Sequence, residues 1–574
     1  MPFQHISALM SLFGSIQLAG NTLRAADVGL QVVGNNIANA NTPGYARQEV
    51  VLEPAPTQRL GNLLLGLGVR VVGIAQKVDE NLNERLRNAS SDAASSETQK
   101  NTYEQLEGLV AELGENDLST SLNNFFASVS DVLNQPESVS VRNLAMLKGK
   151  ALAGDINRLA ARVRQIRSDT NARVVDAATN INRLLNNIRD LNIKVAEAEG
   201  GVSKSDAASL RDQRNNDLAE LAKLIDIKVH EQPSGGVAVF TPDGDYLVFE
   251  GNLRNVRTQN RSEDGQTTTE IRLVETDALV SITSGQTGGL IRARDEILGG
   301  FLDTLDTFAQ TLAFEFNKLY ASGQGLNGYS TVSSEFPISD TSQPLDDAGL
   351  PFTPVNGSFD VLVYNKRTKL TQTTKITVDL NGLDSDTSLA SLQSQLSSIN
   401  GISAAVSADG RLTLTSDSAD QSIAFANDTS GVLASLGLNT FFSGSSALNL
   451  SVNPAVVADP SLFAASKGGV GADTNNAVEL VGFLDRTLDS QSGATLNDLY
   501  AQLTGDVTQA SAVARSVFEG FKVFEDSLNG QAQAVTGVNL DEEAIKMLGF
   551  QRVYQASAKF ISTVNDLLGV LIDL

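Results

Sequence analysis

The 574-residue sequence contains no cysteine, no tryptophan and only two histidines. Without cysteine the chain can form neither a disulfide nor a thiolate metal site, and only His5 and His230 could offer imidazole to a metal. We therefore expect no metal centre and no cofactor. The absence of cysteine is compatible with a chain that leaves the cell unfolded, although many cytosolic proteins lack cysteine as well.

Basic residues are also scarce, because 43 Lys and Arg face 67 Asp and Glu for a formal net charge of −24. Such an excess of acids argues against nucleic acid or an anionic membrane as the main partner. Arg24 is the first basic residue, so the positive segment of a cleaved secretory signal is missing. Since no apolar run approaches the roughly 20 residues of a membrane-spanning helix, we expect no membrane insertion, and any export must use another route.

Both ends of the chain carry an apolar stripe with the seven-residue repeat typical of coiled coils. The first stripe comprises Ile6, Leu9, Phe13, Ile16, Leu23, Leu30 and Ile37. The second comprises Met547, Phe550, Tyr554, Ile561, Val564, Leu568 and Leu571, with Ser557 interrupting one row. One such end alone would be an ordinary amphipathic helix on a core. Two such stripes at opposite ends of one chain favour pairing of the two helices. The residues of both stripes form the predicted assembly interface.

The first helix should end between Asn35 and Asn41, because Asn is unfavourable inside helices and Thr42 precedes a proline. Pro43 and Gly44 suit the central positions of a type II turn. The predicted joint after the helix consists of Asn39, Asn41, Thr42, Pro43, Gly44 and Tyr45. The alternative is a polar turn without a further role.

Helical periodicity dominates residues 79–226, and its longest seam runs from Ile156 to Val195. The three- and four-residue steps of this seam contain one extra step of four, which would locally unwind a supercoil. The polar faces carry Arg158, Arg162, Arg164, Arg167, Arg173, Arg183 and Arg189. They are either solvated or in contact with an acidic neighbouring subunit.

Two segments have β character. Short β-type runs between Pro, Gly and Asp turns indicate a small insertion at 229–285, and a region rich in Ser, Thr and Gly indicates a β-rich domain at 329–470. Helical seams resume at 297–319 and 496–528. The string Gly323-Gln-Gly-Leu-Asn-Gly328 follows a helix, whereas a dinucleotide site needs it after a strand, so we set that motif aside.

The sequence thus predicts a multidomain α + β protein with nested topology and both termini together. The predicted parts are a terminal helical coiled-coil domain (1–50 and 537–574), a long-helix rod domain (51–228, 286–328 and 471–536), the small β insertion and a β-rich outer domain. Whether the outer domain is one lobe or two stays open. The last helix should begin with Asn539 as its cap and Glu542 in a capping box.

Burial of about eight apolar side chains, worth roughly 2 kcal/mol each, barely offsets the entropy of ordering the first helix. We therefore expect the ends to be loosely ordered in the isolated monomer and to fold when copies pack together.

Two other classes of function, an enzyme and an adhesin or secreted effector, compete with a structural role. A catalytic triad would have to use His5 or His230, and the sequence contains neither a phosphate-binding GxxxxGK string nor HExxH. A carboxylate pair for glycoside hydrolysis stays open among 67 acids. An adhesin or secreted effector would suit the Ser- and Thr-rich β domain, but neither class explains two heptad ends. We expect no enzyme.

Short motifs carry a resemblance to a known family. The segment Ala38-Asn-Ala-Asn-Thr-Pro-Gly-Tyr45 with Arg47-Gln48 resembles the signature of bacterial flagellar rod, hook and hook-associated proteins. The segment Gly537-Val-Asn-Leu-Asp-Glu-Glu543, with the residues from Phe550 to Thr563, is similar to the C-terminal signature of the hook-associated protein 1 family.

The resemblance implies a structural subunit exported unfolded through the flagellar type III apparatus without a cleaved signal peptide. It would lie outside the cell, as a ring at the junction of hook and filament. The implied partners are further copies of the chain, the hook protein, hook-associated protein 3 and an export chaperone on the C-terminal helix.

Overall fold

The computed structural model describes residues 2–60, 63–111, 118–200, 206–263, 266–383, 385–471 and 473–572; the side chains at 2–10, 60, 63, 111, 263, 571 and 572 are not described. The chain forms two compact units. Unit 1 consists of Met1–Asn101, Asp169–Ala293 and Val513–Leu574, and unit 2 consists of Thr102–Ser168 and Arg294–Ala512.

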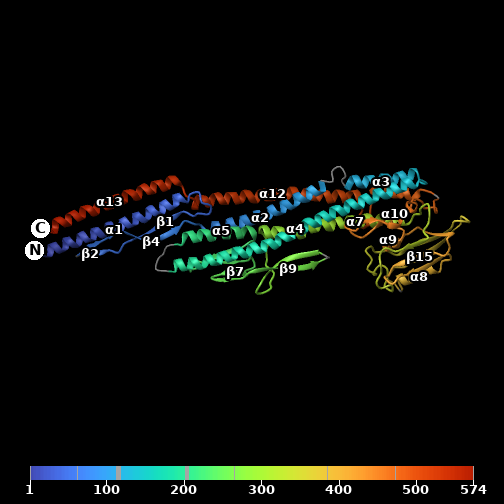
Figure 1. Ribbon diagram of the computed structural model, residues 1–574, viewed down its shortest axis with the longest axis horizontal. Coiled ribbons are helices and arrows are strands. Elements are labelled where there is room, and N and C mark those ends of the chain that lie inside the picture. Colours follow the sequence, from blue (N-terminus) through green and yellow to red (C-terminus); the bar gives the residue numbers. More distant parts are fainter. Residues whose placement is uncertain are drawn as a thin grey trace. The chain divides into compact units, whose positions relative to one another are not determined.

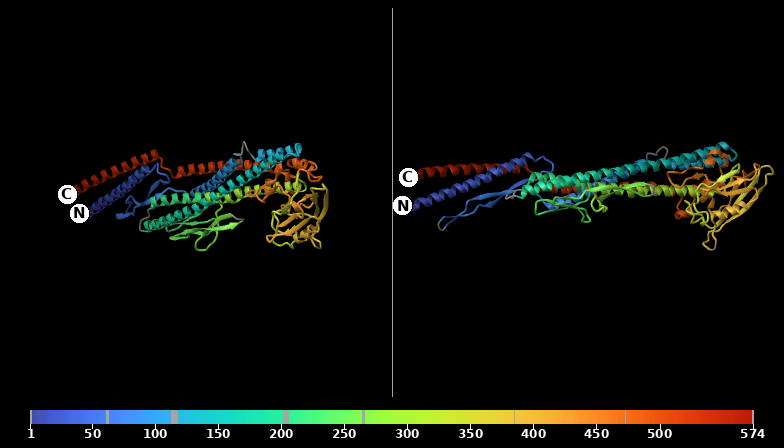
Figure 2. Two further views of the ribbon diagram at one scale, coloured as in Figure 1. Left: turned by 45° about the vertical axis from the view of Figure 1, so that its right-hand side comes forward. Right: turned by 60° about the horizontal axis from the view of Figure 1, so that its bottom comes forward.

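In unit 1 the first and last helices, α1 (Pro2–Ala38) and α13 (Leu540–Ile572), lie side by side with both chain ends together (Figures 1 and 2). Next to α1 lies an antiparallel ribbon, made of β1 (Gln48–Pro54) with β4 (Val69–Gln76) and of β2 (Gln58–Leu60) with β3 (Leu63–Leu65). The register of β1 and β4 shifts between Val51 and Leu52.

The remainder of unit 1 combines helices with two small sheets. Its helices are α5 (Ala208–Leu224), α6 (Gly285–Arg292) and parts of α2 (Glu80–Ala111), α4 (Val139–Glu199) and α12 (Leu496–Thr536). A four-stranded sheet contains β5 (Lys228–Glu231), β6 (Val237–Phe240), β7 (Tyr246–Phe249) and β8 (Asn252–Leu253). Strands β9 (Val256–Glu263) and β10 (Gln266–Leu273) pair separately. Ile181 and Ile188 of α4 pack with Leu221 of α5 and Val239 of β6 in one apolar core.

Unit 2 combines helices with a β-rich part. Its helical elements are α3 (Leu118–Asn134), the other parts of α2, α4 and α12, the π-helix η1 (Ala293–Leu298), α7 (Gly299–Ala321), α10 (Pro454–Ala458), α11 (Asn475–Val481) and the short 3-10 turns η2 (Pro460–Leu462), η3 (Gly482–Asp485) and η4 (Asp489–Gln491). Its β-rich part contains β11 (Thr331–Ser333), β12 (Gly357–Asn365), β13 (Thr371–Val378), α8 (Leu389–Ser397), β14 (Ile402–Val406), β15 (Leu412–Ser416), β16 (Gln421–Ala426), α9 (Val432–Leu436), β17 (Phe442–Ser443) and β18 (Ser451–Val452).

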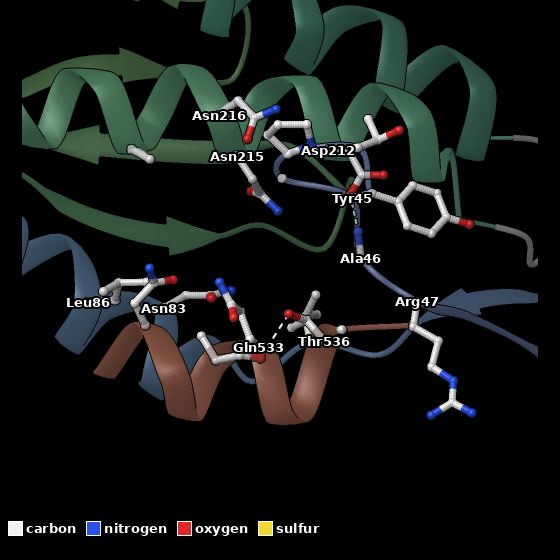
Figure 3. Close-up of a pocket in the computed structure, with 18 of the residues that line it drawn as sticks. Tyr45, Ala46, Arg47, Asn83, Leu86, Asp212, Asn215, Asn216, Gln533 and Thr536 are labelled. Atoms are coloured by element: carbon white, nitrogen blue, oxygen red, sulfur yellow. Dashed lines mark hydrogen bonds between the residues drawn. The ribbon is translucent and has the colours of Figure 1, made fainter. Parts of the chain in front are cut away.

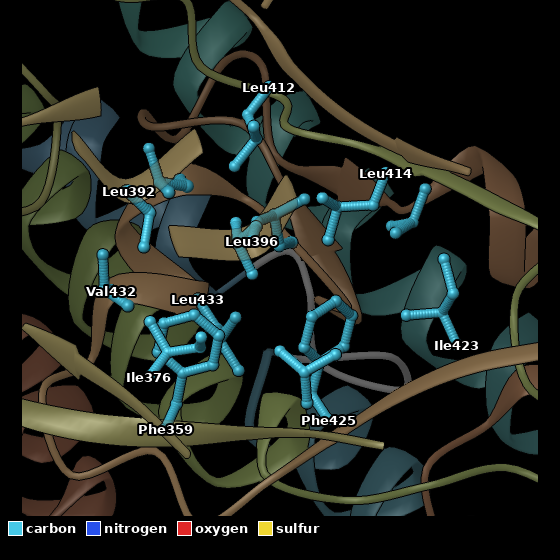
Figure 4. Close-up of a cluster of buried hydrophobic side chains, with 14 of the residues drawn as sticks. Phe359, Ile376, Leu392, Leu396, Leu412, Leu414, Ile423, Phe425, Val432 and Leu433 are labelled. Carbon is cyan, nitrogen blue, oxygen red and sulfur yellow. The ribbon is translucent and has the colours of Figure 1, made fainter. Parts of the chain in front are cut away.

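The β-rich part of unit 2 contains two three-stranded sheets, ordered β11-β15-β14 and β13-β12-β16, and the short pair β17-β18. Side chains from both larger sheets and from α8 and α9 share one apolar core (Figure 4). Phe359, Leu396, Leu412 and Phe425 are among its buried members.

The glycines of the Gly323–Gly328 string have a packing role. A Cβ atom on Gly323, Gly325 or Gly328 would collide with Asn476, Ser461 and Ile423 respectively. The loop therefore passes against neighbouring chain segments at distances that only glycine allows.

Most elements expected from the sequence are present. Strands β6 and β7 lie within the small β insertion expected at 229–285. The seam from Ile156 to Val195 lies on one continuous helix, α4, and its apolar members are largely buried. The finer division into a terminal domain, a rod and an outer domain stays a prediction, as do the coiled coil and the nesting. None of the helices in the described ranges is apolar over a stretch long enough to span a bilayer.

Candidate functional site at the joint of the terminal motifs

The turn that ends the first helix has the predicted geometry. The Tyr45 N–H donates to the Thr42 carbonyl at 3.2 Å, and Gly44 has a φ of 74°. Glycine adopts this left-handed conformation without steric cost. A Cβ at Gly44 would also collide with the side chain of Asn216 on α5, so the turn rests directly on that helix.

A buried asparagine connects the end of α1 to the segments on either side of it. The Asn36 side chain donates to the Gln48 carbonyl at 2.9 Å and to the Glu543 carboxylate at 3.0 Å. Its Oδ1 accepts from the Tyr45 hydroxyl at 2.8 Å and from the Gln48 N–H at 3.0 Å. Because all four bonds are satisfied in a buried position, Asn36 fixes the N-terminal motif against the start of α13.

The strongest charge interaction at the joint is between Arg47 and Glu543. Arg47 Nε and one terminal nitrogen reach Glu543 Oε1 at 2.9 and 2.7 Å, and its other terminal nitrogen lies 2.9 Å from Glu542. The Glu543 side chain is fully buried. The Arg47 N–H also donates to the carbonyl of Thr536, the last residue of α12, at 2.9 Å. One residue of the N-terminal motif therefore holds both helices of the C-terminal segment.

Burial and pairing shift the pKa values of these groups in different directions. Burial alone would raise the pKa of Glu543, but hydrogen bonds from Asn36 and Arg47 outweigh it, so the pKa lies below the ordinary value. Burial, assisted by the charges of Asp212 and Glu543, raises the pKa of Tyr45 to about 12. Glu543 is therefore ionised and Tyr45 neutral near pH 7, which their hydrogen bonds require.

Asp212 of α5 holds the same motif from a third side. Its Oδ1 accepts from the Ala46 N–H at 3.2 Å and from the Gln76 side chain at 2.6 Å. Burial raises the pKa of Asp212 to about 6, although both hydrogen bonds act in the opposite direction. The carboxyl therefore titrates close to neutrality.

An open cavity of about 950 Å³ lies beside the joint. Its walls are the motif loop from Ala40 to Arg47, helices α2, α5 and α12, and the connection from α12 to α13. Figure 3 shows labelled side chains from these helices around it, including Asn83, Asn215 and Gln533. The cavity and the polar network form one site made entirely by unit 1.

The predicted helix start at Asn539 is present, with one correction. The Asn539 side chain accepts from the Asp541 N–H at 2.9 Å and the Glu542 N–H at 3.3 Å, as a cap should. The Glu542 carboxylate, predicted to reach back to the cap, is instead paired with Arg47. The capping-box prediction is therefore wrong for that half.

The predicted stripe of α13 faces α1, whereas the predicted stripe of α1 is displaced. A Cβ on Gly29 would lie 2.6 Å from the Phe550 ring, so this ring packs against the α1 backbone. The buried row of α1 contains Ala19, Ala26, Gly29, Val33 and Asn36, one position before the predicted row. Small residues let the two helices approach closely, which a pattern based on large apolar residues does not reveal.

The structure places the predicted interface residues as follows. On α13, Val564 is buried, Met547, Phe550, Ile561 and Leu568 are half-buried, and Tyr554 is marginally exposed. On α1, Ile16, Leu23, Leu30 and Ile37 are half-buried, while Phe13 is 58% exposed and lies in no buried seam of unit 1. Ile6, Leu9 and Leu571 fall outside the described side chains. Their role in assembly stays a prediction for all of them.

The joint residues have different surroundings. Asn39, Thr42 and Asn35 hydrogen-bond to one another at the exposed end of α1, and Tyr45 is half-buried in the Asn36 network. Asn41, Pro43 and Gly44 are exposed along the cavity. Arg47 and Glu543 lie within the two terminal motifs, but the motifs alone do not predict that they pair. Their partnership joins positions 496 residues apart, and no local spacing could have indicated it.

Comparisons with known proteins agree over most of the chain. Residues 103–335 match the family described as "Flagellar hook-associated protein FlgK helical domain". Residues 531–574 match "Flagellar basal body rod FlgEFG protein C-terminal", and residues 16–45 match "Flagella basal body rod protein". The last two matches contain much of the predicted terminal stripes.

Full-length relatives have the same extent as this chain. Flagellar hook-associated protein 1 of Escherichia coli (strain K12) is 23% identical over 97% of this chain and 99% of its own length. The protein of the same name from Bacillus subtilis (strain 168) is 24% identical over 98% of this chain and 99% of its own length. A solved structure, the flagellar hook junction protein FlgK from Burkholderia pseudomallei, covers 79% of this chain with all of its own, at 15% identity and a TM-score of 0.50. This match shows that the two chains have a similar fold.

These matches decide between the classes of function that the sequence left open. The matched families and relatives are flagellar rod and hook-associated proteins and not enzymes, in agreement with the expected structural role. With agreement at both ends, in the helical middle and over the full length of the relatives, the comparisons confirm the resemblance to flagellar hook-associated protein 1 that the terminal motifs predicted.

Proposed function

We propose that this chain is a structural subunit of the bacterial flagellum that forms the junction between hook and filament. It would be exported as an unfolded chain through the flagellar type III apparatus and assemble outside the cell through its terminal helices. Its partners would be further copies in a ring, the hook protein below, hook-associated protein 3 above and an export chaperone on the C-terminal helix. The names of the relatives support the location, and the terminal helices support the mode of assembly.

The observation that carries this proposal is a second apolar face on α13. Besides the stripe toward α1, this helix exposes Ile545, Leu548, Phe560, Leu567 and Val570. At 100° per residue these five side chains fall within about 120° of arc, on the side roughly opposite the α1-facing stripe. Ile545 is 70% exposed and Val570 is 60% exposed. A helix that is apolar on two faces is typical of one that packs on two sides.

The amount of apolar surface indicates how many neighbours are needed. Each half-exposed side chain would gain about 1 kcal/mol on full burial, so the five together give about 5 kcal/mol. Association of two proteins costs about 4–15 kcal/mol in lost freedom before any gain appears. One neighbour is therefore insufficient, and stable association requires each subunit to contact several others at once, as in a ring or tube.

Export unfolded fits the composition and the weakness of the ends. The absence of cysteine means that no disulfide has to be reduced before passage. The α1 row that meets α13 is built from small residues, which bury little apolar surface, so the pair is held largely by the polar joint. Terminal helices of this kind can separate during transport and order again in the assembly.

The proposal is tested by co-sedimentation of the full chain with hook fragments. The double variant Leu548→Asp, Leu567→Asp places two charges on the second apolar face and should abolish co-sedimentation. The matched control Gln551→Asp, Ser562→Asp adds similar negative charge to exposed polar positions of the same helix and should leave co-sedimentation intact.

Two seam variants test the pairing of the ends in the same assay. Leu23→Asp and Ile561→Asp should abolish assembly while the β-rich part of unit 2 stays folded. If the Leu23→Asp variant of this chain still supported filament growth on hooks, assembly would not depend on the terminal helices.

A further inference from the structure

The cavity at the joint has an unusual lining. Six amide side chains, Asn41, Asn83, Asn215, Asn216, Asn529 and Gln533, line it and have no hydrogen-bond partner within the described ranges. They come from the motif loop, α2, α5 and α12. Figure 3 shows four of them, Asn83, Asn215, Asn216 and Gln533, around the cavity. Each amide offers two donors and one acceptor oxygen. Asn83 and Asn215 are half-buried and the other four are exposed, so the cavity presents a dense set of hydrogen-bonding groups that a bound segment could reach.

The charges of the lining cancel. Three basic side chains, Arg47, Arg87 and Lys223, stand against the three acidic side chains Asp212, Glu525 and Glu542. The chain as a whole carries −24. Two copies repel each other over most of their surfaces, and the repulsion is weakest where the local charge is balanced. Balanced charge favours a second copy as the occupant over a strongly charged ligand.

The chemistry of the lining also restricts the kind of contact. An amide side chain carries the same donor and acceptor groups as a peptide bond, so a set of amides can pair with main-chain N–H and C=O groups whatever the side chains are. Large apolar side chains in this lining are limited to Val78, Leu86 and Val538, with no aromatic ring apart from Tyr45, so an apolar small molecule would find little to contact. A segment of polypeptide with free main-chain groups fits these walls.

We infer that the joint cavity is a docking site for an extended segment of a second copy of this chain, recognised through its main-chain groups. The inference rests on the proposed function as an assembling subunit and gives that assembly a second contact, separate from the apolar face of α13. The walls include parts of both segments that match flagellar rod proteins, residues 16–45 and 531–574, which fits a contact made between axial subunits.

A photo-crosslinking amino acid placed at Asn216 of the full chain identifies the occupant. In assembled protein it should give a covalent dimer of this chain, and mass spectrometry should find an extended segment at the crosslink. The control position is Gln213, which is exposed on the same helix outside the cavity lining and should give no dimer through that segment. Crosslinks within one chain alone, or to a different molecule, would overturn the inference.

Alanine variants measure what the amides contribute. The triple variant Asn83→Ala, Asn216→Ala, Gln533→Ala removes cavity amides from α2, α5 and α12. The control triple Asn88→Ala, Gln213→Ala, Gln531→Ala removes exposed amides from the same three helices outside the lining. Since one neutral hydrogen bond changes an association constant by roughly 2- to 10-fold, we expect the cavity triple to lower self-association about 10-fold or more and the control by less than about 3-fold.

The outcomes separate this inference from the proposed function. If wild-type protein sediments with hook fragments and both triples self-associate equally, the docking site is refuted and the proposed function stands. If wild-type protein fails to sediment with hook fragments, the proposed function fails. Self-association and the Asn216 crosslink then still decide whether the cavity binds a second copy.

Discussion

Helices α7 and α13 have similar apolar content but opposite surroundings. In unit 2, α7 buries Phe301, Leu305, Phe308, Leu312 and Phe316, and the Phe316 ring lies 5.4–6.0 Å from the rings of five other phenylalanines. In unit 1, the buried side chains among those described on α13 are Glu543, Ser557 and Val564. An apolar helix that its own unit covers has its partners already, whereas a half-exposed one keeps apolar surface that its own unit does not use.

The two helices are also fixed by different forces. Helix α7 is held by aromatic packing around Phe316, and α13 is held at its first turn by a buried polar network between Asn36, Arg47 and Glu543. Hydrogen bonds and ion pairs depend on direction and leave apolar faces free, so this polar network, the latch, can position α13 without using the apolar face that we propose for assembly. The comparison therefore predicts large apolar effects in unit 2 and large polar effects at the joint.

The largest expected effect is the loss of an aromatic ring from α7. Phe316→Ala should lower the free energy of unfolding of unit 2 by about 3–5 kcal/mol, because the cavity left among the phenylalanines cannot close fully. Leu567→Ala, at a side chain 52% exposed on α13, should change the stability of the monomer by less than about 0.5 kcal/mol. Denaturant unfolding with hydrogen exchange measures both. Equal losses would show that α13 is covered within the monomer.

The second largest effect should come from the latch. Arg47→Met should destabilise the pairing of α1 and α13 by about 2–3 kcal/mol, because it leaves the buried Glu543 carboxylate with Asn36 and the half-exposed Lys546 as partners. Hydrogen exchange of the α1 and α13 amides provides the measurement. Lys546→Met, which removes a more exposed partner of the same carboxylate, should cost less than about 1 kcal/mol.

The pH dependence of the latch has a defined sign. The folded pKa of Glu543 is lowered, so its contribution to stability is full above the unfolded value of about 4.3 and is lost as pH falls through the lower folded value. The difference between wild type and Arg47→Met should therefore be constant from pH 8 to 5 and shrink below pH ~4. A difference that shrinks between pH 8 and 5 would show that a group other than Glu543 sets the pH dependence of the latch.

The sequence predicted elements better than contacts. The start of α13 at Asn539 and the turn at Gly44 follow from local rules, since capping and positive φ are decided by neighbouring residues. The pairing of Arg47 with Glu543 follows from the fold, and many acids in the chain could have served equally well. The order of residues along the chain does not indicate which of these acids pairs with Arg47.

The displaced seam of α1 has a different cause. Large apolar residues such as Leu23 and Leu30 marked the stripe, but contact with α13 uses the row of Ala26, Gly29 and Val33. Close approach of two helices favours small residues, which a search for large apolar side chains overlooks. The half-buried Leu23 and Leu30 then lie at the edge of the helix pair.

A smaller effect is expected at the turn. Gly44→Ala should cost about 1–2 kcal/mol, because alanine is strained at a φ of 74° and its Cβ must displace Asn216. Pro43→Ala should cost only about 0.5 kcal/mol, chiefly through a more flexible unfolded chain. Hydrogen exchange at the end of α1 reports both. A Pro43 variant more damaging than the Gly44 variant would mean that rigidity, and not the contact with α5, sets the turn.

An effect of the opposite sign is expected at Asp212. Its folded pKa is about 6, above the ordinary value of 3.8, so the neutral form favours the folded state. The stability gained this way is full below pH ~4 and is lost as pH rises through about 6. Asp212→Asn keeps an oxygen that can accept from the Ala46 N–H and removes the buried charge, so at pH 8 it should stabilise the joint by about 1 kcal/mol.

Thermal unfolding of wild type and Asp212→Asn at pH 8 and pH 4.5 tests this expectation. The variant should melt higher at pH 8, and the two proteins should melt together at pH 4.5, where the wild-type carboxyl is already largely neutral in the folded state. Glu220→Gln is the control, because Glu220 is exposed on the same helix and does not line the cavity. If Asp212→Asn were destabilising at pH 8, the ionised carboxylate would be part of the latch, and α13 would depend on polar contacts at α5 as well as at α1.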